Sequence, residues 1–136
     1  MSKNMSIKKL TFEAAQKAFV NAYAPYSGFH VGAAIRTKDG RTFGGCNVEN
    51  ASYGATVCAE RGALFSAIAD SGVTEFDHLV VVSSSDPPAV PCALCLQVLS
   101  EFCGADFPVY LADTGGIKKS VTLGELLPYP FNEIPK

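Results

Sequence analysis

The chain has 136 residues, of which 48% are hydrophobic and 18% charged, and this size and composition are typical of one globular domain over residues 1–136. Its net charge is -2, and its eleven Lys and Arg residues are scattered along the sequence. A surface that follows a phosphate backbone needs clustered positive charge, so we expect no nucleic-acid partner.

The N-terminal residues are polar, and no apolar run approaches the length that spans a membrane, so we expect a cytoplasmic protein without a membrane partner. An odd number of cysteines in a reducing compartment argues against a disulfide framework and for metal binding or catalysis by some of them. The five are Cys46, Cys58, Cys92, Cys95 and Cys103.

Helical spacing of apolar residues predicts a first helix over 11–23, with Thr11 as its N-cap and Glu13 in its first turn. Two strand-like runs, 29–36 and 41–47, flank Asp39-Gly40, a dipeptide that favours a β-hairpin. These segments predict a helix packed near two antiparallel strands.

The second half of the chain alternates helices with strands. A helix is predicted over 57–71, with Gly72 as its C-cap, and a β-branched run over 79–82 indicates a strand covered on both faces. A third helix over 92–103 is expected to bury Leu94, Val98, Leu99 and Phe102. Strands over 107–111 and 118–121 and a helical turn over 123–127 follow.

This order of elements predicts an α/β fold. With right-handed crossovers it gives a central, mixed, five-stranded sheet with helices on both faces, a three-layer α/β/α sandwich. No internal repeat or linker divides it.

Two predicted helix starts carry thiols that suit a metal ion. The Cys92-x-x-Cys95 pair alone is a weak signal, since it can be half of a zinc ribbon, a redox motif or a coincidence. A thioredoxin-like site is disfavoured by its position in the chain, and a complete zinc ribbon lacks a second pair. Cys58, Cys92 and Cys95 each lie in the first turn of a predicted helix, where the macrodipole favours a thiolate, so we expect a zinc site with one open position.

The negative charge of a three-thiolate zinc site suggests roles for Glu60 and Arg61, which follow Cys58 in the sequence. Zn²⁺ with three thiolates has a net charge of about -1, so hydroxide forms on it less readily than on a His-ligated zinc. The two helix starts and Arg61 are expected to compensate this charge. Glu60 is expected to lie over the open position and to transfer protons as a general acid and base.

The sequence resembles a known family at this point. Cys-Ala-Glu followed by Pro-Cys-x-x-Cys is the three-cysteine form of the zinc nucleoside and nucleobase deaminase signature. Segments 24–34 (APYSGFHVGAA), 45–54 (GCNVENASYG) and 126–128 (LLP), with Phe131, are similar to the small homotetrameric cytidine deaminases. The resemblance covers nearly the whole chain.

This resemblance implies hydrolysis of cytidine and 2′-deoxycytidine to uridine and 2′-deoxyuridine with release of ammonia, in pyrimidine salvage. A zinc-bound hydroxide would attack C4 while Glu60 transfers protons. The resemblance also assigns substrate-binding residues: Phe29 packs on the pyrimidine, Asn47 and Glu49 bind ribose hydroxyls, Ala59 contacts the base through its backbone, and Tyr53 and Phe131 complete the pocket of a neighbouring subunit.

The chain departs from the family pattern at two positions. Ala93 replaces the usual glycine and Leu96 the usual arginine of Pro-Cys-Gly-x-Cys-Arg-Gln, whereas Gln97 is retained. Without that arginine, we expect Arg61 to carry more of the charge compensation.

Other residues and functions have plainer interpretations. Cys46 and Cys103 are expected to be small packing residues, and His30 and His78 ordinary polar positions. Two alternatives stay open. One is a non-enzymatic module with structural zinc, in which Glu60 is a surface residue and a fourth protein ligand saturates the metal. The other is a related deaminase acting on a nucleotide or on an antibiotic such as blasticidin S. Glu49 would repel a phosphate, which favours an unphosphorylated ribose.

Overall fold

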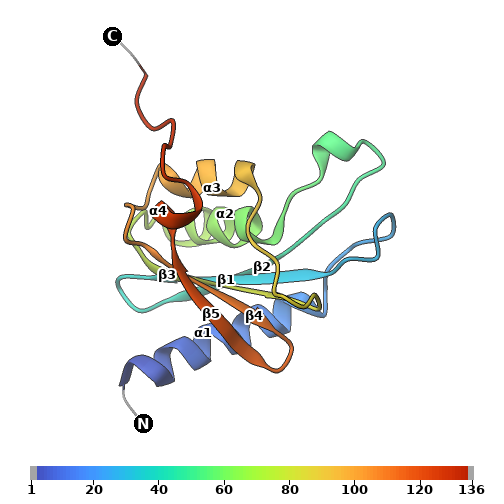
Figure 1. Cartoon of the computed structure of the whole chain (residues 1–136), viewed down its shortest axis with the longest axis horizontal. Coiled ribbons are helices and arrows are strands. Elements are labelled where there is room, and N and C mark those ends of the chain that lie inside the picture. The colour runs from blue at the N-terminus through green and yellow to red at the C-terminus, as the bar shows by residue number, and fades with distance from the viewer. Residues whose placement is uncertain (1–2, 135–136) are drawn as a thin grey trace.

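The computed structural model describes residues 3–134 and has the three layers that the sequence predicts (Figure 1). One mixed sheet has the strand order β2-β1-β3-β4-β5. Only β3 and β4 are parallel, and the other neighbours are antiparallel. The strands are β1 (Val31–Thr37), β2 (Thr42–Cys46), β3 (Phe76–Ser83), β4 (Pro108–Asp113) and β5 (Gly116–Thr122).

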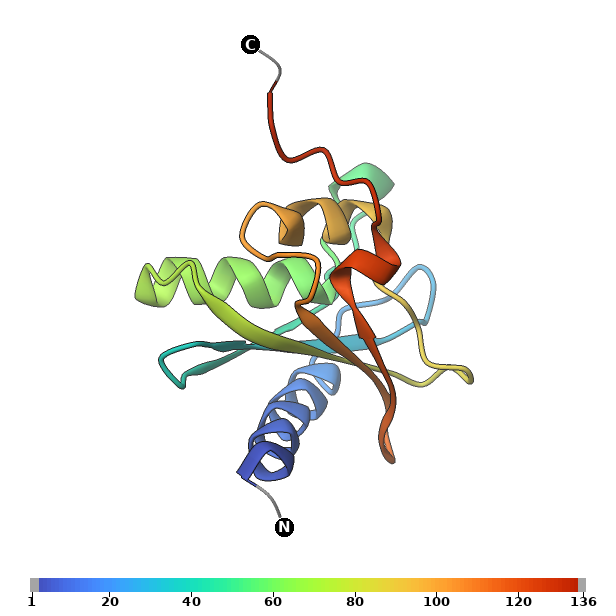
Figure 2. The same cartoon turned by 60° about the vertical axis from the view of Figure 1, so that its left-hand side comes forward.

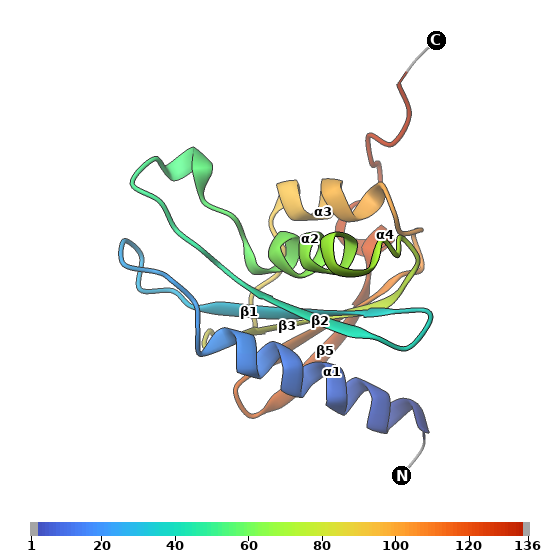
Figure 3. The same cartoon turned by 180° about the vertical axis from the view of Figure 1, so that it is seen from behind.

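Helices cover both faces of this sheet. Helix α1 (Lys3–Phe19) lies on one face, and α2 (Ala59–Ser71) and α3 (Ala93–Ser100) lie side by side on the other (Figures 2 and 3). A 3₁₀ turn, η1 (Tyr53–Ala55), precedes α2, and the short α4 (Leu123–Leu126) follows β5. None of the helices within residues 3–134 has the length and apolar character needed to cross a membrane.

The central strands alternate between two hydrophobic cores. In β3, Leu79 and Val81 pack toward α2 and α3, whereas Val80 and Val82 pack toward α1. All four are at most 1% exposed, which confirms the prediction of a strand covered on both faces.

The first helix differs from the prediction at both ends. It begins at Lys3 and ends at Phe19, so Thr11 is in its middle and is not its N-cap, and Glu13 is not in its first turn. No Gly or Pro interrupts residues 3–19, so the helix continues upstream of Thr11. Thr11 is fully buried, and its hydroxyl donates to the carbonyl of Ile7 at 3.0 Å.

The other helix ends also refine the predictions. Cys58 is the N-cap of α2, and Gly72 ends that helix in the left-handed conformation that its C-cap position predicts. Helix α3 stops at Ser100, three residues before Cys103. The burial of Leu94 was predicted wrongly, since 63% of it is exposed; the buried side of α3 is made by Cys95, Leu96 and Leu99.

Two glycines let the helices touch the sheet backbone. A Cβ on Gly32 of β1 would lie 2.2 Å from the Ala15 carbonyl oxygen of α1, and a Cβ on Gly45 of β2 would lie 2.2 Å from the Ala63 nitrogen of α2. Any larger residue would push the helix off the sheet. Gly45 therefore fixes how closely the first turns of α2 approach β2.

We expect Gly45→Ala to lower the free energy of unfolding by about 1–3 kcal/mol, because the added methyl group overlaps the α2 backbone. Urea unfolding measures this loss. Gly54→Ala is the matched control, since a Cβ there meets nothing within 4 Å. Equal stability of the two variants would contradict the close-contact role of Gly45.

A polar network is buried under α1. His78 is 3% exposed, its Nδ1 lies 2.7 Å from an Asp77 carboxylate oxygen, and its Nε2 lies 2.9 Å from the Thr11 hydroxyl. Burial lowers the pKa of His78, an effect that the Asp77 carboxylate opposes. His78 therefore joins the sheet to α1, which is more than the ordinary polar role expected for it.

This network predicts an acid-sensitive stability. The folded pKa of His78 lies below its unfolded value, so the unfolded chain takes up the proton first, and stability present above about pH 6.5 is lost as pH falls. We expect His78→Gln to flatten the stability profile between pH 5 and pH 7 by at most about 1.4 kcal/mol per pH unit. Urea unfolding across that range checks it, and parallel profiles for both proteins would contradict it.

Candidate active site and metal centre

Two helix starts bring three thiols together. Cys58 is the N-cap of α2, Cys92 is the N-cap of α3, and Cys95 lies in the first turn of α3. Neither cap side chain forms a capping hydrogen bond to the backbone of its helix, so both sulfurs are available to a shared metal ion. The sequence placed each thiol at a helix start, and the structure puts these starts next to each other.

The spacing of the sulfurs fits zinc. The Sγ atoms of Cys58 and Cys92 are 3.6 Å apart, those of Cys92 and Cys95 are 3.5 Å apart, and all three lie within 4.8 Å of one another. Zn–S bonds of about 2.3 Å in a tetrahedron place neighbouring sulfurs about 3.8 Å apart. The three thiols therefore fit the metal as ligands and leave a fourth position for another molecule.

The thiols favour ionisation at Cys58. Hydrogen bonding from Cys95, joined by Arg61 and Cys92, lowers the pKa of Cys58 to about 5. The hydrogen bond to Cys58 and burial raise the pKa of Cys95, so its proton is displaced only when a cation replaces it. Metal binding by these thiols is therefore coupled to proton release.

Arg61 lies against the sulfurs from the first turn of α2. Its Nη2 is 3.6 Å from the Cys58 Sγ and 3.4 Å from the Thr56 carbonyl oxygen. The hydrogen bond to Cys58 raises the pKa of Arg61, which keeps the guanidinium charged. This contact agrees with the charge compensation that the sequence predicts.

Glu60 is a buried acid beside the thiols, with 5% exposure. Burial raises its pKa to about 7, and the nearby charge of Cys58 adds to the increase. A carboxyl group with a pKa near neutrality can both accept and donate a proton, as general acid-base catalysis requires.

A cavity of about 270 Å³ opens over Glu60 and two of the sulfurs. It gathers most of the residues predicted to bind substrate, which come from the segment before β1, the residues after β2 and the start of α2. Those in its lining are Phe29, Asn47, Glu49, Cys58, Ala59, Glu60 and Cys92. Cys95 is fully buried and is not in that lining.

The lining also includes residues that the sequence did not single out, among them Ser27, Thr56 and Val90. Ser27 lies inside segment 24–34, which resembles the family, but its residue type alone does not indicate a function. Thr56 and Val90 enter the site because the turns before α2 and α3 fold over it.

Asn47 and Glu49 are both held by the segment that carries Phe29. The Asn47 amide accepts from the Val31 N–H at 2.9 Å and donates to the Phe29 carbonyl at 2.8 Å. The Glu49 carboxylate accepts hydrogen bonds from Tyr26 and Ser27. The hydrogen bond from the Ser27 hydroxyl lowers the pKa of Glu49, which keeps its carboxylate ionised.

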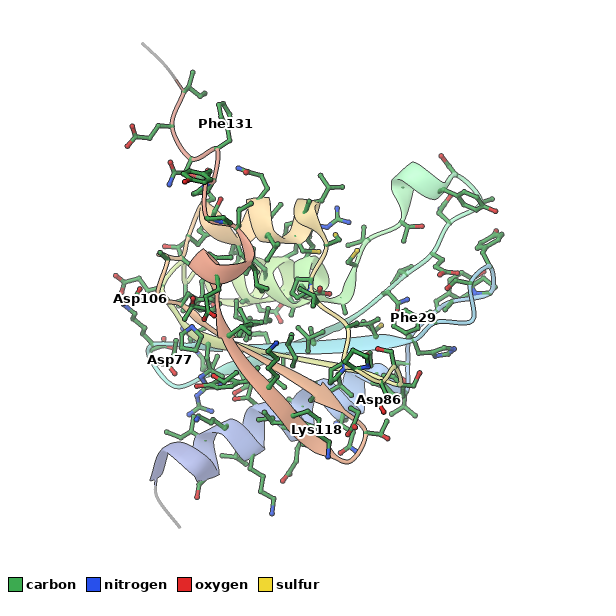
Figure 4. All side chains as sticks on the ribbon, viewed as in Figure 1. Phe29, Asp77, Asp86, Asp106, Lys118 and Phe131 are labelled. Atoms are coloured by element: carbon green, nitrogen blue, oxygen red, sulfur yellow. The ribbon has the colours of Figure 1, made fainter. Side chains whose placement is uncertain are left out.

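Tyr53 and Phe131 lie outside the cavity of their own chain. Tyr53 is 77% exposed and lines an adjacent hollow, and Phe131 is 65% exposed on the C-terminal tail. Figure 4 shows Phe131 at the top, on the C-terminal tail, and Phe29 well apart from it, at the right of the sheet. The tail is anchored by Gln97 of α3, whose amide donates to the Phe131 carbonyl and accepts from the Phe131 N–H at 3.3 Å.

The two departures from the family pattern have different surroundings. Leu96 is 6% exposed and belongs to the core between the sheet and the helices. Ala93 is exposed at the start of α3. Leu96 is apolar and brings no charge to the sulfurs. The guanidinium that contacts them is that of Arg61.

Other polar features lie away from this cavity. A larger hollow of about 520 Å³, at the other end of β1 and β3, is lined by charged side chains such as Lys8, Arg36 and Asp77, but it lacks a cluster of thiols. Figure 4 labels Asp77 at that end. Cys103 packs against the core, and burial raises its pKa to about 12, as its predicted packing role requires. Cys46 is half-buried, and the ring of His30 lies tilted beside that of Phe19, with centroids 6.1 Å apart.

Comparisons with known proteins agree with this site. Residues 5–111 match the model of the cytidine and deoxycytidylate deaminase zinc-binding region. A cytidine deaminase of Sporosarcina psychrophila is 45% identical, covering 95% of this chain and 93% of that protein. A blasticidin-S deaminase of Bacillus cereus is 33% identical, covering 75% of this chain and 76% of that protein.

A solved structure gives the same result for the fold. The crystal structure of a cytidine deaminase from Burkholderia pseudomallei matches with a TM-score of 0.84 and 44% identity, covering 96% of this chain and all of that one. Sequence, fold and the three-thiol centre thus agree. The chain belongs to the zinc-binding family of cytidine and deoxycytidylate deaminases.

Proposed function

We propose that the protein hydrolyses cytidine and 2′-deoxycytidine to uridine and 2′-deoxyuridine with release of ammonia. The observation that carries this proposal is the burial of Glu60 beside three clustered thiols, in the same cavity as Phe29 and Glu49. Cys58, Cys92 and Cys95 would hold a zinc ion, which would supply the Lewis-acid chemistry that turns water into a nucleophile.

Glu60 serves as the proton carrier. Its pKa of about 7 lets it accept a proton from the attacking water and deliver it to N3 of the pyrimidine. A second proton, from the hydroxyl added to C4, then passes through Glu60 to the amine as the C4–N bond breaks and the C4 carbonyl forms. Its burial excludes bulk water, so the proton is transferred within the pocket. This role needs a carboxyl group beside the metal, which a purely structural zinc site does not.

Substrate recognition is divided among the other lining residues. Phe29 packs on the pyrimidine ring, and the backbone of Ala59 contacts the base. Glu49, which stays ionised, can only accept hydrogen bonds, so it suits a ribose hydroxyl and repels a phosphate. Asn47 binds the sugar with the hydrogen-bonding capacity that its two backbone contacts leave free.

We also propose a homotetramer that acts in pyrimidine salvage in the cytoplasm. One chain supplies a cavity of about 270 Å³, which is slightly below the range of about 300–1,000 Å³ typical of small-molecule pockets. Exposed Tyr53 and Phe131 provide aromatic surface that a neighbouring subunit's pocket can take up. Free thiols as metal ligands suit a reducing compartment.

Assaying cytidine, 2′-deoxycytidine, deoxycytidine monophosphate and blasticidin S side by side tests this function. We expect turnover of the two nucleosides and little of the nucleotide, because Glu49 repels its phosphate. The lower identity to the blasticidin-S deaminase gives the antibiotic less support than cytidine. Stoichiometric zinc without turnover of any of the four compounds would favour the structural-zinc alternative.

We expect Glu60→Gln to lower kcat by about 10²–10⁴-fold while the fold and the bound zinc are kept, because the amide is isosteric but carries no transferable proton. Absorbance assays of cytidine and metal analysis measure the two effects. Near-normal deamination would remove Glu60 from the mechanism.

We expect Arg61→Gln to weaken zinc retention by about tenfold, and more at pH 6 than at pH 8. Loss of the guanidinium raises the pKa of Cys58, so protons compete with zinc for this sulfur at a higher pH. Zinc release to a chelator at both pH values measures the change. Arg41→Gln, at an exposed ion pair with Asp39, is the control, and equal retention in the two variants would contradict the role of Arg61.

A further inference from the structure

The backbone of Phe29 is held at both of its polar groups by side chains. Its N–H donates to the Ser27 hydroxyl at 3.0 Å, and its carbonyl accepts from the Asn47 amide at 2.8 Å. Phe29 precedes β1, so these groups are not paired within the sheet. The position of the aromatic ring therefore depends on two side chains.

The Ser27 hydroxyl also donates to Glu49. It accepts from the Phe29 N–H and donates to Oε2 of the carboxylate, so one hydroxyl group connects the two residues. The N–H groups of Tyr26 and Ser27 donate to the other oxygen, Oε1, at 2.9 and 3.1 Å. Glu49 is thereby fixed to the segment that carries Phe29.

We propose that Ser27 is a positioning residue that joins sugar recognition by Glu49 to base recognition by Phe29, and that Glu49 thereby accepts a hydrogen bond from one sugar hydroxyl only. This inference rests on the proposed function, because it assigns a role within the same nucleoside pocket.

Counting lone pairs supports the single hydroxyl. An ionised carboxylate has about four acceptor sites, two on each oxygen. Two N–H groups occupy those of Oε1, and the Ser27 hydroxyl occupies one on Oε2. One acceptor site is left on Oε2. Because an ionised carboxylate can only accept hydrogen bonds, this site takes a donor such as a sugar hydroxyl.

The hydroxyl of Ser27 is suited to this role by its two functions. A hydroxyl can donate to Glu49 and accept from Phe29 at the same time, which neither alanine nor glycine can do. Ser27 is exposed in a loop, so removing its hydroxyl leaves no cavity in the core and should not unfold the protein. A loss of activity would then report on the geometry of the pocket.

The test compares cytidine with 2′,3′-dideoxycytidine, which lacks both ring hydroxyls, in the zinc-loaded protein. We expect Ser27→Ala to lower kcat/KM for cytidine by about tenfold, mainly through KM, and to lower it much less for the dideoxynucleoside. The preference of the Ser27→Ala variant for cytidine over the dideoxynucleoside should therefore be small, as it should be in a Glu49→Gln variant. Ser27→Thr, which keeps a hydroxyl, should restore it.

A double-mutant cycle isolates the coupling. In a Glu49→Gln background, Ser27→Ala should cost less than about twofold, because the interaction that it supports is already altered. Ser120→Ala, which removes an exposed hydroxyl on β5, is the control and should leave kcat/KM for both substrates unchanged. Thermal unfolding of each variant checks that the fold is kept.

Each result has a defined meaning. Equal losses for both substrates on Ser27→Ala, additive losses in the cycle, or unchanged kinetics in an active enzyme would overturn the role of Ser27. Failure of the zinc-loaded wild-type protein to deaminate cytidine would overturn the proposed function itself, and this outcome differs from the others because the unmodified protein shows it.

Discussion

The structure depends on holding three sulfurs close together while offsetting their negative charge. Two helices begin at this point, so their unpaired N–H groups face the thiols, and Arg61 adds a full positive charge at 3.6 Å from Cys58. The starts of α2 and α3 can meet only because both helices lie on the same face of the sheet. Gly45 brings α2 against that face at backbone distance.

Much of the fold and of the metal centre could be predicted from sequence. The β-branched run of β3 indicated a strand buried on both faces, and the cysteines before α2 and α3 indicated ligands at helix starts, because each signal lies in a short stretch of chain. The exact ends of helices were harder. Leu94 has the residue type of a core position, but the direction of α3 turns it outward.

The substrate side of the site was less predictable. Phe29, Asn47 and Glu49 were proposed from family resemblance, and residue type alone gives a strand-end Asn no special status. Their geometry is fixed by hydrogen bonds between side chains and backbone groups that are 16 to 23 residues apart in the sequence. Such contacts depend on how loops meet in space. Ser27 lies in this set, and its single hydroxyl has no periodic pattern that would reveal it.

The anchoring of the C-terminal tail has a practical consequence for handling the protein. Gln97 ties the backbone at Phe131 to the same helix that carries Cys92 and Cys95, whereas α1 lies on the opposite side of the sheet. An affinity tag fused after the tail would crowd the aromatic residue proposed to enter a neighbouring subunit and could strain the helix that holds the metal. A tag placed ahead of α1 would be separated from both by the full thickness of the sheet.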